Sequence, residues 1–213
     1  MTTGLPSTFV RLATCNLRCS WCDTRYSWDW ADYDPKQEIT TLAAGDIASR
    51  VRSTSVSNVV ITGGEPLLQM PGVAELATNL KAAGLRIEVE TNGTIAPSGQ
   101  LAEAIDQWNV SPKLTSSGNP TELREIPDAL HWFAGQPNAY LKFVVDARPD
   151  VDEAMDLAMR YGAPEAQVVL MPQGMDAESI RERSLWLADE CQQRGVRFST
   201  RLHILLWGPE RGR

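Results

Sequence analysis

The segment that decides the fold is Asn58-Val59-Val60-Ile61-Thr62-Gly63-Gly64-Glu65-Pro66. Its first five residues predict a short buried strand, because most of them are apolar and β-branched. Two glycines end the strand, and apolar residues then recur at helical spacing from Val73 to Leu80, before Gly84. A buried strand, a glycine turn and an amphipathic helix together predict one βα unit of a parallel sheet.

The same alternation of strand and helix continues on both sides of this segment. Strands are expected at residues 8–12, 58–62, 85–90, 108–111, 140–145, 167–170 and 202–206. Helices are expected at residues 73–80, 154–161 and 180–191, each followed by a glycine. Crossovers of this kind are right-handed, so the pattern predicts a parallel α/β sheet, open or curled into a barrel, in a single domain over residues 1–213.

The composition is that of an ordinary globular chain. The 213 residues include 20 basic and 27 acidic side chains, which gives a formal charge of −7, and 43% are hydrophobic. This acidic balance, without a basic stretch, argues against a nucleic-acid partner. The longest apolar runs, such as 204–207, are far shorter than the roughly 20 residues of a membrane-spanning helix. No secretory leader is recognisable at residues 1–6, so we expect a cytoplasmic protein with no membrane contact.

The segments that carry chemical groups all follow predicted strands. A cysteine-rich loop follows the strand at 8–12, Gly63-Gly64-Glu65-Pro66 follows the second strand, and Thr91-Asn92-Gly93-Thr94 follows the third. In barrels and in open α/β sheets, ligands bind at the loops that leave the carboxyl ends of the strands. The sequence therefore predicts one site built from these three loops.

Three of the four cysteines lie in the first loop, where Cys15, Cys19 and Cys22 have the spacing C-x3-C-x2-C. A closed zinc site requires four ligands, usually from two separated pairs, and no such second pair is present. An iron-sulfur cubane usually takes four thiolates, so three thiolates would leave one iron free to bind another molecule. Cys191 lies on the apolar face of a predicted helix and is expected to be a buried thiol without chemistry.

These motifs resemble those of the radical S-adenosylmethionine (SAM) superfamily, in which SAM chelates the fourth iron of a [4Fe-4S] cluster. Further stretches resemble one family within it, the 7-carboxy-7-deazaguanine synthases. They are 9–12, 21–28, 62–67, 90–94, 111–113, 141–145, 171–174 and 202–208. The resemblance implies an incomplete TIM-like barrel of mostly parallel strands with outer helices, and a cluster loop at residues 14–33.

The resemblance also implies roles for individual residues, none of which acts as an acid or base. Cys15, Cys19 and Cys22 would bind the cluster, and Thr24 would bind Mg²⁺ through its hydroxyl. Arg11 and Thr62 would contact substrate. The residues implied to line SAM are Trp21, Cys22, Asp23, Gly64, Ser111, Pro112, Lys113 and Gln173.

The implied reaction is the lyase conversion of 6-carboxy-5,6,7,8-tetrahydropterin to 7-carboxy-7-deazaguanine with loss of ammonia, in queuosine-type deazapurine biosynthesis. A 5′-deoxyadenosyl radical made from SAM would start it, after electron delivery from a donor such as flavodoxin. A homodimer is also implied. Two alternatives remain open: a radical SAM enzyme that activates a protein partner, and a non-enzymatic zinc-binding module.

The chain departs from the family at its start. The family normally begins with a strand and a Gln-Gly-Glu-Gly turn that contacts substrate, and this sequence starts about where that turn ends. A different start, a natural variant, or another segment on that side of the pocket would each account for the difference. His203 is expected at the start of the last strand, with function and core packing equally open.

Overall fold

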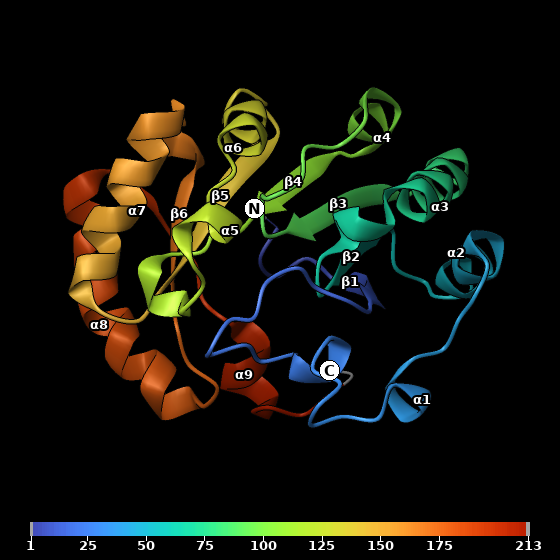
Figure 1. Ribbon diagram of the computed structural model, residues 1–213, viewed down its shortest axis with the longest axis horizontal. Helices are drawn as coiled ribbons and strands as arrows, with labels where there is room; N and C mark the ends of the chain where they lie inside the picture. The colour runs from blue at the N-terminus through green and yellow to red at the C-terminus, as the bar shows by residue number, and fades with distance from the viewer. Residues whose placement is uncertain (1, 212–213) are drawn as a thin grey trace.

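A computed structural model of the chain describes residues 2–211, which contain one parallel sheet of seven strands (Figure 1). The strands are β1 (Ser7–Leu12), β2 (Asn58–Gly63), β3 (Arg86–Thr91), β4 (Gln107–Val110), β5 (Ala139–Val145), β6 (Val168–Pro172) and β7 (Arg197–Phe198). Each strand pairs with the next strand in the chain, and no pairing joins β1 to β7 within the described residues. Sequential order without closure confirms the expected incomplete barrel.

The longer helices cover the outer face of the sheet, as Figure 1 shows. The longer ones are α2 (Ala44–Arg52), α3 (Met70–Ala82), α4 (Gly99–Ala104), α6 (Pro127–Ala134), α7 (Arg148–Tyr161) and α8 (Ala177–Arg194). The shorter ones are α1 (Pro35–Glu38), α5 (Thr121–Arg124) and α9 (Leu202–Trp207), with 3₁₀ turns η1 (Arg25–Ser27), η2 (Pro66–Gln69), η3 (Thr115–Ser117) and η4 (Glu165–Gln167). No helix within residues 2–211 combines the length and apolar character needed to cross a membrane.

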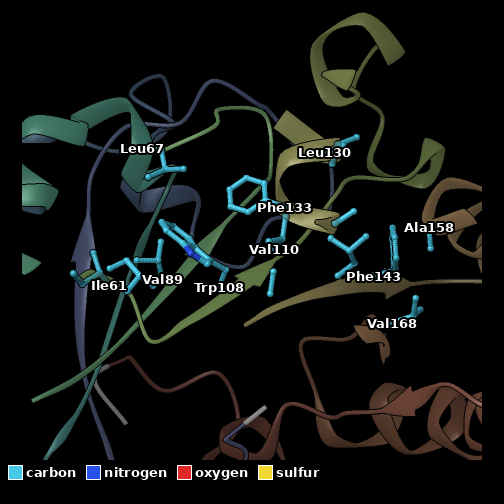
Figure 2. Close-up of a cluster of buried hydrophobic side chains, with 14 of the residues drawn as sticks. Ile61, Leu67, Val89, Trp108, Val110, Leu130, Phe133, Phe143, Ala158 and Val168 are labelled. Carbon is cyan, nitrogen blue, oxygen red and sulfur yellow. The ribbon is translucent and has the colours of Figure 1, made fainter. Parts of the chain in front are cut away.

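The hydrophobic core lies between the sheet and these helices (Figure 2). Alternate strand residues such as Ile61, Val89 and Phe143 point outward into it and are fully buried. Trp108 of β4 packs edge-on against Phe133 of α6, with ring centroids 5.5 Å apart. The periodic helices predicted before Gly84, Gly162 and Gly195 are confirmed as α3, α7 and α8.

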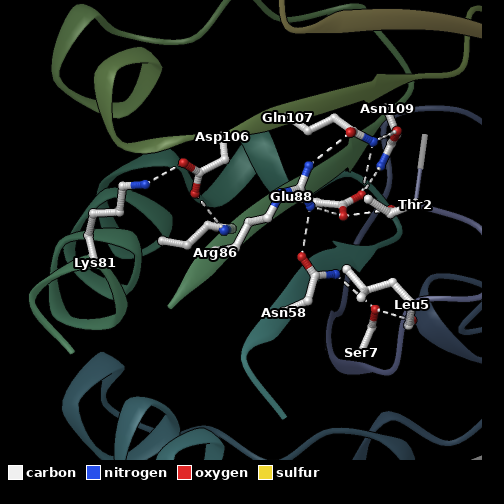
Figure 3. Close-up of polar contacts among 11 residues, drawn as sticks. Thr2, Leu5, Ser7, Asn58, Lys81, Arg86, Glu88, Asp106, Gln107 and Asn109 are labelled. Atoms are coloured by element: carbon white, nitrogen blue, oxygen red, sulfur yellow. Dashed lines mark hydrogen bonds and ion pairs between the residues drawn. The ribbon is translucent and has the colours of Figure 1, made fainter. Parts of the chain in front are cut away.

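The inner face of the sheet is polar at the amino-terminal end of the barrel (Figure 3). The buried carboxylate of Glu88 accepts hydrogen bonds from Thr2 Oγ1 at 2.6 Å, Gln107 Nε2 at 3.1 Å and Asn109 Nδ2 at 2.8 Å. Arg86 pairs with the same carboxylate. Because these polar atoms bond to one another, the network satisfies the buried polar groups at the amino-terminal end, opposite the loops that carry the predicted site.

One predicted strand is wrong. Residues 202–206 form helix α9 instead, and the last strand is the short β7 before it. Ile204 is buried, whereas Leu205 and Leu206 are exposed, so the apolar run has one buried side and not the two of a central strand. A short apolar run is compatible with either structure, because periodicity cannot be read over so few residues. His203 therefore lies on a helix, and its side chain is not part of the sheet.

Candidate metal and cofactor site

The glycine turn after β2 packs directly against the start of the cysteine loop. A Cβ atom at Gly64 would lie 2.1 Å from Thr14 O, and one at Gly63 would lie 2.0 Å from Leu12 O. Gly64 N donates to Leu12 O at 3.0 Å, and Glu65 N donates to Thr14 O at 2.8 Å. Thr14 itself has φ 81°, a conformation that a residue with a Cβ rarely adopts. The glycines thus let two strand ends approach closely enough to set the direction of the loop.

The three loop thiols are free, and each sulfur lies next to a different hydrogen-bond donor. Cys15 Sγ accepts from Leu17 N at 3.4 Å, Cys19 Sγ from Asn119 Nδ2 at 3.3 Å, and Cys22 Sγ from Trp28 Nε1 at 3.3 Å. Burial raises the pKa of the Cys15 thiol to about 11 and also raises that of Cys19, so a positive metal centre is needed to hold them as thiolates.

This donor set fits an iron-sulfur cluster. Thiolate ligands that accept amide and indole hydrogen bonds are the usual surroundings of such clusters. Within residues 2–211, no three His, Cys, Asp or Glu side chains are grouped as ligands of a single ion. In a cubane each thiolate binds a different iron, so its ligands do not have to meet at one point. Cys191 lies apart on α8, where its buried Sγ contacts Arg197 O at 3.7 Å, as expected for a core thiol.

A second loop, at residues 111–119 after β4, holds the cysteine loop by its backbone. Ser20 N donates to Ser117 O at 3.0 Å, and Trp21 Nε1 donates to Ser116 O at 3.1 Å. The Lys113 ammonium donates to Ser111 O at 2.8 Å and to its hydroxyl at 2.9 Å.

The same loop brings the Ser-Pro-Lys motif to the thiols. Lys113 Nζ lies 5.8 Å from the centre of the Trp21 ring, and its charge lowers the pKa of Cys15 and Cys19, against the larger effect of burial. Pro112 is buried between Ser111 and Lys113. The structure therefore brings Trp21, Ser111 and Lys113, predicted separately from the sequence, to one side of the thiols.

Buried polar residues tie the loop to β3. The carboxylate of Glu65 accepts from Leu67 N at 2.9 Å, Thr91 Oγ1 at 2.8 Å and Asn92 N at 2.7 Å, and burial raises its pKa. Asn92 Nδ2 in turn donates to Asn16 Oδ1 in the cysteine loop at 2.8 Å. Asn92 thus has a structural role in this network, because it links Glu65 to the cysteine loop.

The inner face of the barrel carries a row of charged groups beside this loop. Arg11 and Thr62 are register partners on β1 and β2. Thr62 Oγ1 donates to Glu90 Oε2 at 3.0 Å, and Lys142 Nζ lies 3.0 Å from Glu90 Oε1. The Lys142 ammonium holds the pKa of Glu90 at about 2, outweighing the effect of burial. The two residues predicted to contact substrate therefore lie beside the Glu90–Lys142 ion pair, a pairing that is not predicted from the sequence.

Three more predicted residues, Asp23, Thr24 and Gln173, have their own contacts. Asp23 Oδ2 accepts from Arg201 Nη1 at 2.9 Å, and Arg201 also donates to Gly174 O at 3.2 Å. Gln173 follows β6, where its backbone N donates to Val145 O at 2.8 Å, and within residues 2–211 no hydrogen bond joins its side chain to the other predicted residues. Thr24 Oγ1 lies 3.7 Å from Cys22 Sγ. Burial, followed by the charge of Arg201, lowers the pKa of His203.

The sequence missed Asn119, Arg201 and Lys142 as site residues. Lys142 leaves a recognisable signal, because it is a charged residue inside the otherwise apolar segment 141–145 of β5. Asn119 and Arg201 leave none, since both reach the cysteine loop from distant segments.

Comparison with known proteins identifies related chains. Residues 10–113 match the Radical SAM superfamily. A 7-carboxy-7-deazaguanine synthase of Pyrobaculum aerophilum is 39% identical over 99% of this chain and 90% of its own length. One from Hyperthermus butylicus is 33% identical over 97% of this chain and 87% of its own. The crystal structure of QueE from Escherichia coli has the same fold, with a TM-score of 0.67 at 24% identity over 93% of this chain and 86% of that one.

Proposed function

Because the chain belongs to the 7-carboxy-7-deazaguanine synthase family of radical SAM enzymes, we propose that it is a carbon–nitrogen lyase of 7-deazapurine biosynthesis. Its reaction is the ring contraction of 6-carboxy-5,6,7,8-tetrahydropterin to 7-carboxy-7-deazaguanine with release of ammonia. One observation carries this proposal: three donor-bonded thiols and a charged row on the barrel's inner face lie at the same end of the sheet.

Membership of the family implies a [4Fe-4S] cluster and SAM. Cys15, Cys19 and Cys22 hold the cluster, with their sulfurs fixed by the three donors described above. When bound, the cluster and SAM supply a carbon radical that removes hydrogen from the substrate. The protein's own contribution is to hold the reacting groups close together and to exclude water.

The residues that hold SAM carry both signs of charge, as a zwitterionic ligand requires. The Lys113 ammonium suits its carboxylate, and the Asp23 carboxylate suits a positive or N–H-bearing group. Trp21 and Ser111 orient Lys113, while Gly64 offers backbone without a side chain. Pro112 and Gln173 complete the proposed lining.

Substrate recognition rests on the charged row. Arg11 pairs with the substrate carboxylate, and Thr62 offers a hydroxyl beside it. Glu90 accepts the Thr62 hydrogen bond and balances Lys142, so the row presents one net positive charge, that of Arg11. That sign suits a carboxylated substrate.

Magnesium is assigned to Thr24. Mg²⁺ prefers hard oxygen ligands and keeps several bound waters. One protein hydroxyl, together with the substrate carboxylate, is therefore enough to hold it. Thr24 Oγ1 lies 3.7 Å from Cys22 Sγ, so a Mg²⁺ ion held by Thr24 would be close to the proposed cluster ligands. Thr24→Ala should lose most of the Mg²⁺ stimulation of activity, whereas Thr54→Ala, a hydroxyl bonded to Val51 O at 2.8 Å, should keep it. Equal stimulation in both variants removes Thr24 from this role.

The decisive experiment is anaerobic reconstitution with iron and sulfide, followed by incubation with 6-carboxytetrahydropterin, SAM, Mg²⁺ and dithionite. Formation of 7-carboxy-7-deazaguanine is expected, and Cys19→Ala should neither form it nor cleave SAM. Absence of product from wild-type protein whose cluster is spectroscopically intact would sink the proposal.

Two partners complete the proposal. A flavodoxin supplies the electron, so reduced flavodoxin should replace dithionite in the assay.

The second partner is another copy of the chain, because Leu205, Leu206 and Trp207 of α9 are exposed apolar residues. Sedimentation should show a dimer in the wild type and more monomer in Leu206→Ser. An unchanged distribution removes α9 from the interface.

A further inference from the structure

The side-chain amide of Asn119 bonds to the cysteine loop with both of its ends. Oδ1 accepts from Arg18 N at 2.8 Å, and Nδ2 donates to Cys19 Sγ at 3.3 Å. Nδ2 also lies 3.1 Å from Ser117 Oγ, so both of its hydrogens have acceptors. Arg18 N–H can only donate, which requires the amide oxygen to face it and turns the NH₂ group toward sulfur. The orientation of this amide is therefore fixed by its partners.

The segment that carries Asn119 is itself firmly held. Arg124 is buried and donates to Lys113 O at 2.8 Å and to Thr115 Oγ1 at 2.9 Å. Glu153 of α7 pairs with Arg124 at 3.0 Å and accepts from Thr115 N at 3.0 Å. The amide therefore projects from a segment that is anchored to the helix layer, and it can hold the cysteine loop in one position.

We propose that Asn119 is a positioning residue for the cluster ligand Cys19, and that its N–H···S hydrogen bond raises the reduction potential of the cluster. A hydrogen bond to a thiolate withdraws negative charge from the sulfur, so the iron atoms receive less electron density and accept an electron more readily. The electron comes from a low-potential one-electron donor and takes the cluster from its oxidised to its singly reduced state. The inference rests on the ligand assignment in the proposed function.

Two variants distinguish the effects of the two hydrogen bonds made by the Asn119 amide. Asn119→Ala removes both hydrogen bonds, whereas Asn119→Asp keeps an oxygen for Arg18 N–H and replaces the donor with a negative charge. Asn138→Ala is the matched control, because its Nδ2 donates to Ile105 O at 3.0 Å at the opposite end of the sheet.

Hydrogen exchange of the full chain, with and without cluster, tests the positioning role. In Asn119→Ala the peptide covering residues 15–22 should exchange about tenfold faster than in wild type, because Arg18 N–H loses its acceptor. Asn119→Asp and Asn138→Ala should exchange at close to the wild-type rate. Since exchange is also measured without cluster, this result does not depend on the ligand assignment. An unchanged rate in Asn119→Ala overturns the proposal.

A potentiometric titration followed by electron paramagnetic resonance tests the electronic role. At a fixed potential, Asn119→Asp should show about a tenfold lower ratio of reduced to oxidised cluster, which corresponds to 59 mV for one electron. Asn138→Ala should match the wild type. A wild-type potential in Asn119→Asp overturns the proposal, and a variant that retains no cluster is judged on hydrogen exchange alone.

Discussion

Arg201 and Asp23 form an ion pair across the gap between the ends of the sheet, with Nη1 and Oδ2 2.9 Å apart. Arg201 follows β7, Asp23 lies in the cysteine loop after β1, and 178 residues separate them. In Figure 1 the blue loop accordingly lies beside the red helix α9. The side chains thus join the two sides of a barrel that the backbone leaves open.

The first prediction concerns this pair. Arg201→Ala should lower the free energy of unfolding by about 1 to 2 kcal/mol, below the value for a fully buried pair because Asp23 is partly exposed. Urea unfolding of the metal-free chain measures it. Arg183→Ala breaks a more exposed pair with Asp146 and should cost less than about 1 kcal/mol. Equal losses in the two variants would contradict a closing role for Arg201.

The second prediction concerns the glycine turn. Gly64→Ala should prevent retention of a cluster and destabilise the chain by more than about 2 kcal/mol, because its Cβ would overlap Thr14 O and crowd Cys15 Cβ. Gly72→Ala is the control, since nothing lies within 4 Å of its added Cβ in α3. That change should stabilise the helix by about 0.5 to 1 kcal/mol. Iron content and urea unfolding measure both variants, and a cluster retained in Gly64→Ala would rule out the close approach.

The third prediction concerns pH. The pKa of Glu90 is about 2 in the folded chain and near 4.5 when unperturbed, so its ionised form stabilises the fold above about pH 4.5. That contribution is lost as the pH falls toward 2. The free energy of unfolding of Glu90→Gln should be lower than that of wild type by about 1 to 2 kcal/mol at pH 6, allowing for partial exposure of the side chain.

The difference should shrink when the same unfolding measurement is made at pH 3. Glu182→Gln, an exposed glutamate of α8, provides the baseline for loss of one surface charge. A difference for Glu90→Gln that stays constant from pH 6 to pH 3 would show that Lys142 does not hold this carboxylate ionised.

The fourth prediction separates the four cysteines. Alanine at Cys15, Cys19 or Cys22 should each abolish retention of iron and sulfide, because a cubane with two protein ligands is poorly held. Cys191→Ala should retain both at the wild-type level and cost only the packing of a small side chain. Iron and sulfide analysis after anaerobic reconstitution measures all four. Iron loss in Cys191→Ala would place a ligand on α8.

The sequence predicts the parts of this fold whose signals are local. The helices that end near Gly84, Gly162 and Gly195 are recognisable because each glycine supplies a left-handed backbone just beyond an apolar stripe. The strands before the motifs are found because they are β-branched and apolar. Residues 202–206 are misjudged for the opposite reason, since their helical character depends on which neighbours cover Ile204.

The candidate site also has features that the sequence predicts and features that it does not. Cysteine spacing and the glycine turn are properties of continuous segments, so sequence suffices to identify them. The polar network around Glu88 depends on side chains from β2, β3, β4 and the segment before β1, including Asn58 of β2 through its bond to Arg86. Asn119 likewise acquires its role only when the loop after β4 reaches Cys19. Contacts of this kind, between residues distant in the sequence, are set by tertiary packing and produce no periodic pattern in the sequence.

The open sheet also has a consequence for the order of folding. Most paired strands are close in the chain, as in β2 and β3, where Asn58 and Arg86 are 28 residues apart, so the sheet can grow by short closures. The Asp23–Arg201 contact closes a far longer loop of 178 residues. Its entropic cost is repaid only after the sheet has brought the ends of β1 and β7 near each other. We therefore expect the thiols to be presented to iron only after the sheet has formed, and refolding should show amide protection in the strands before iron uptake.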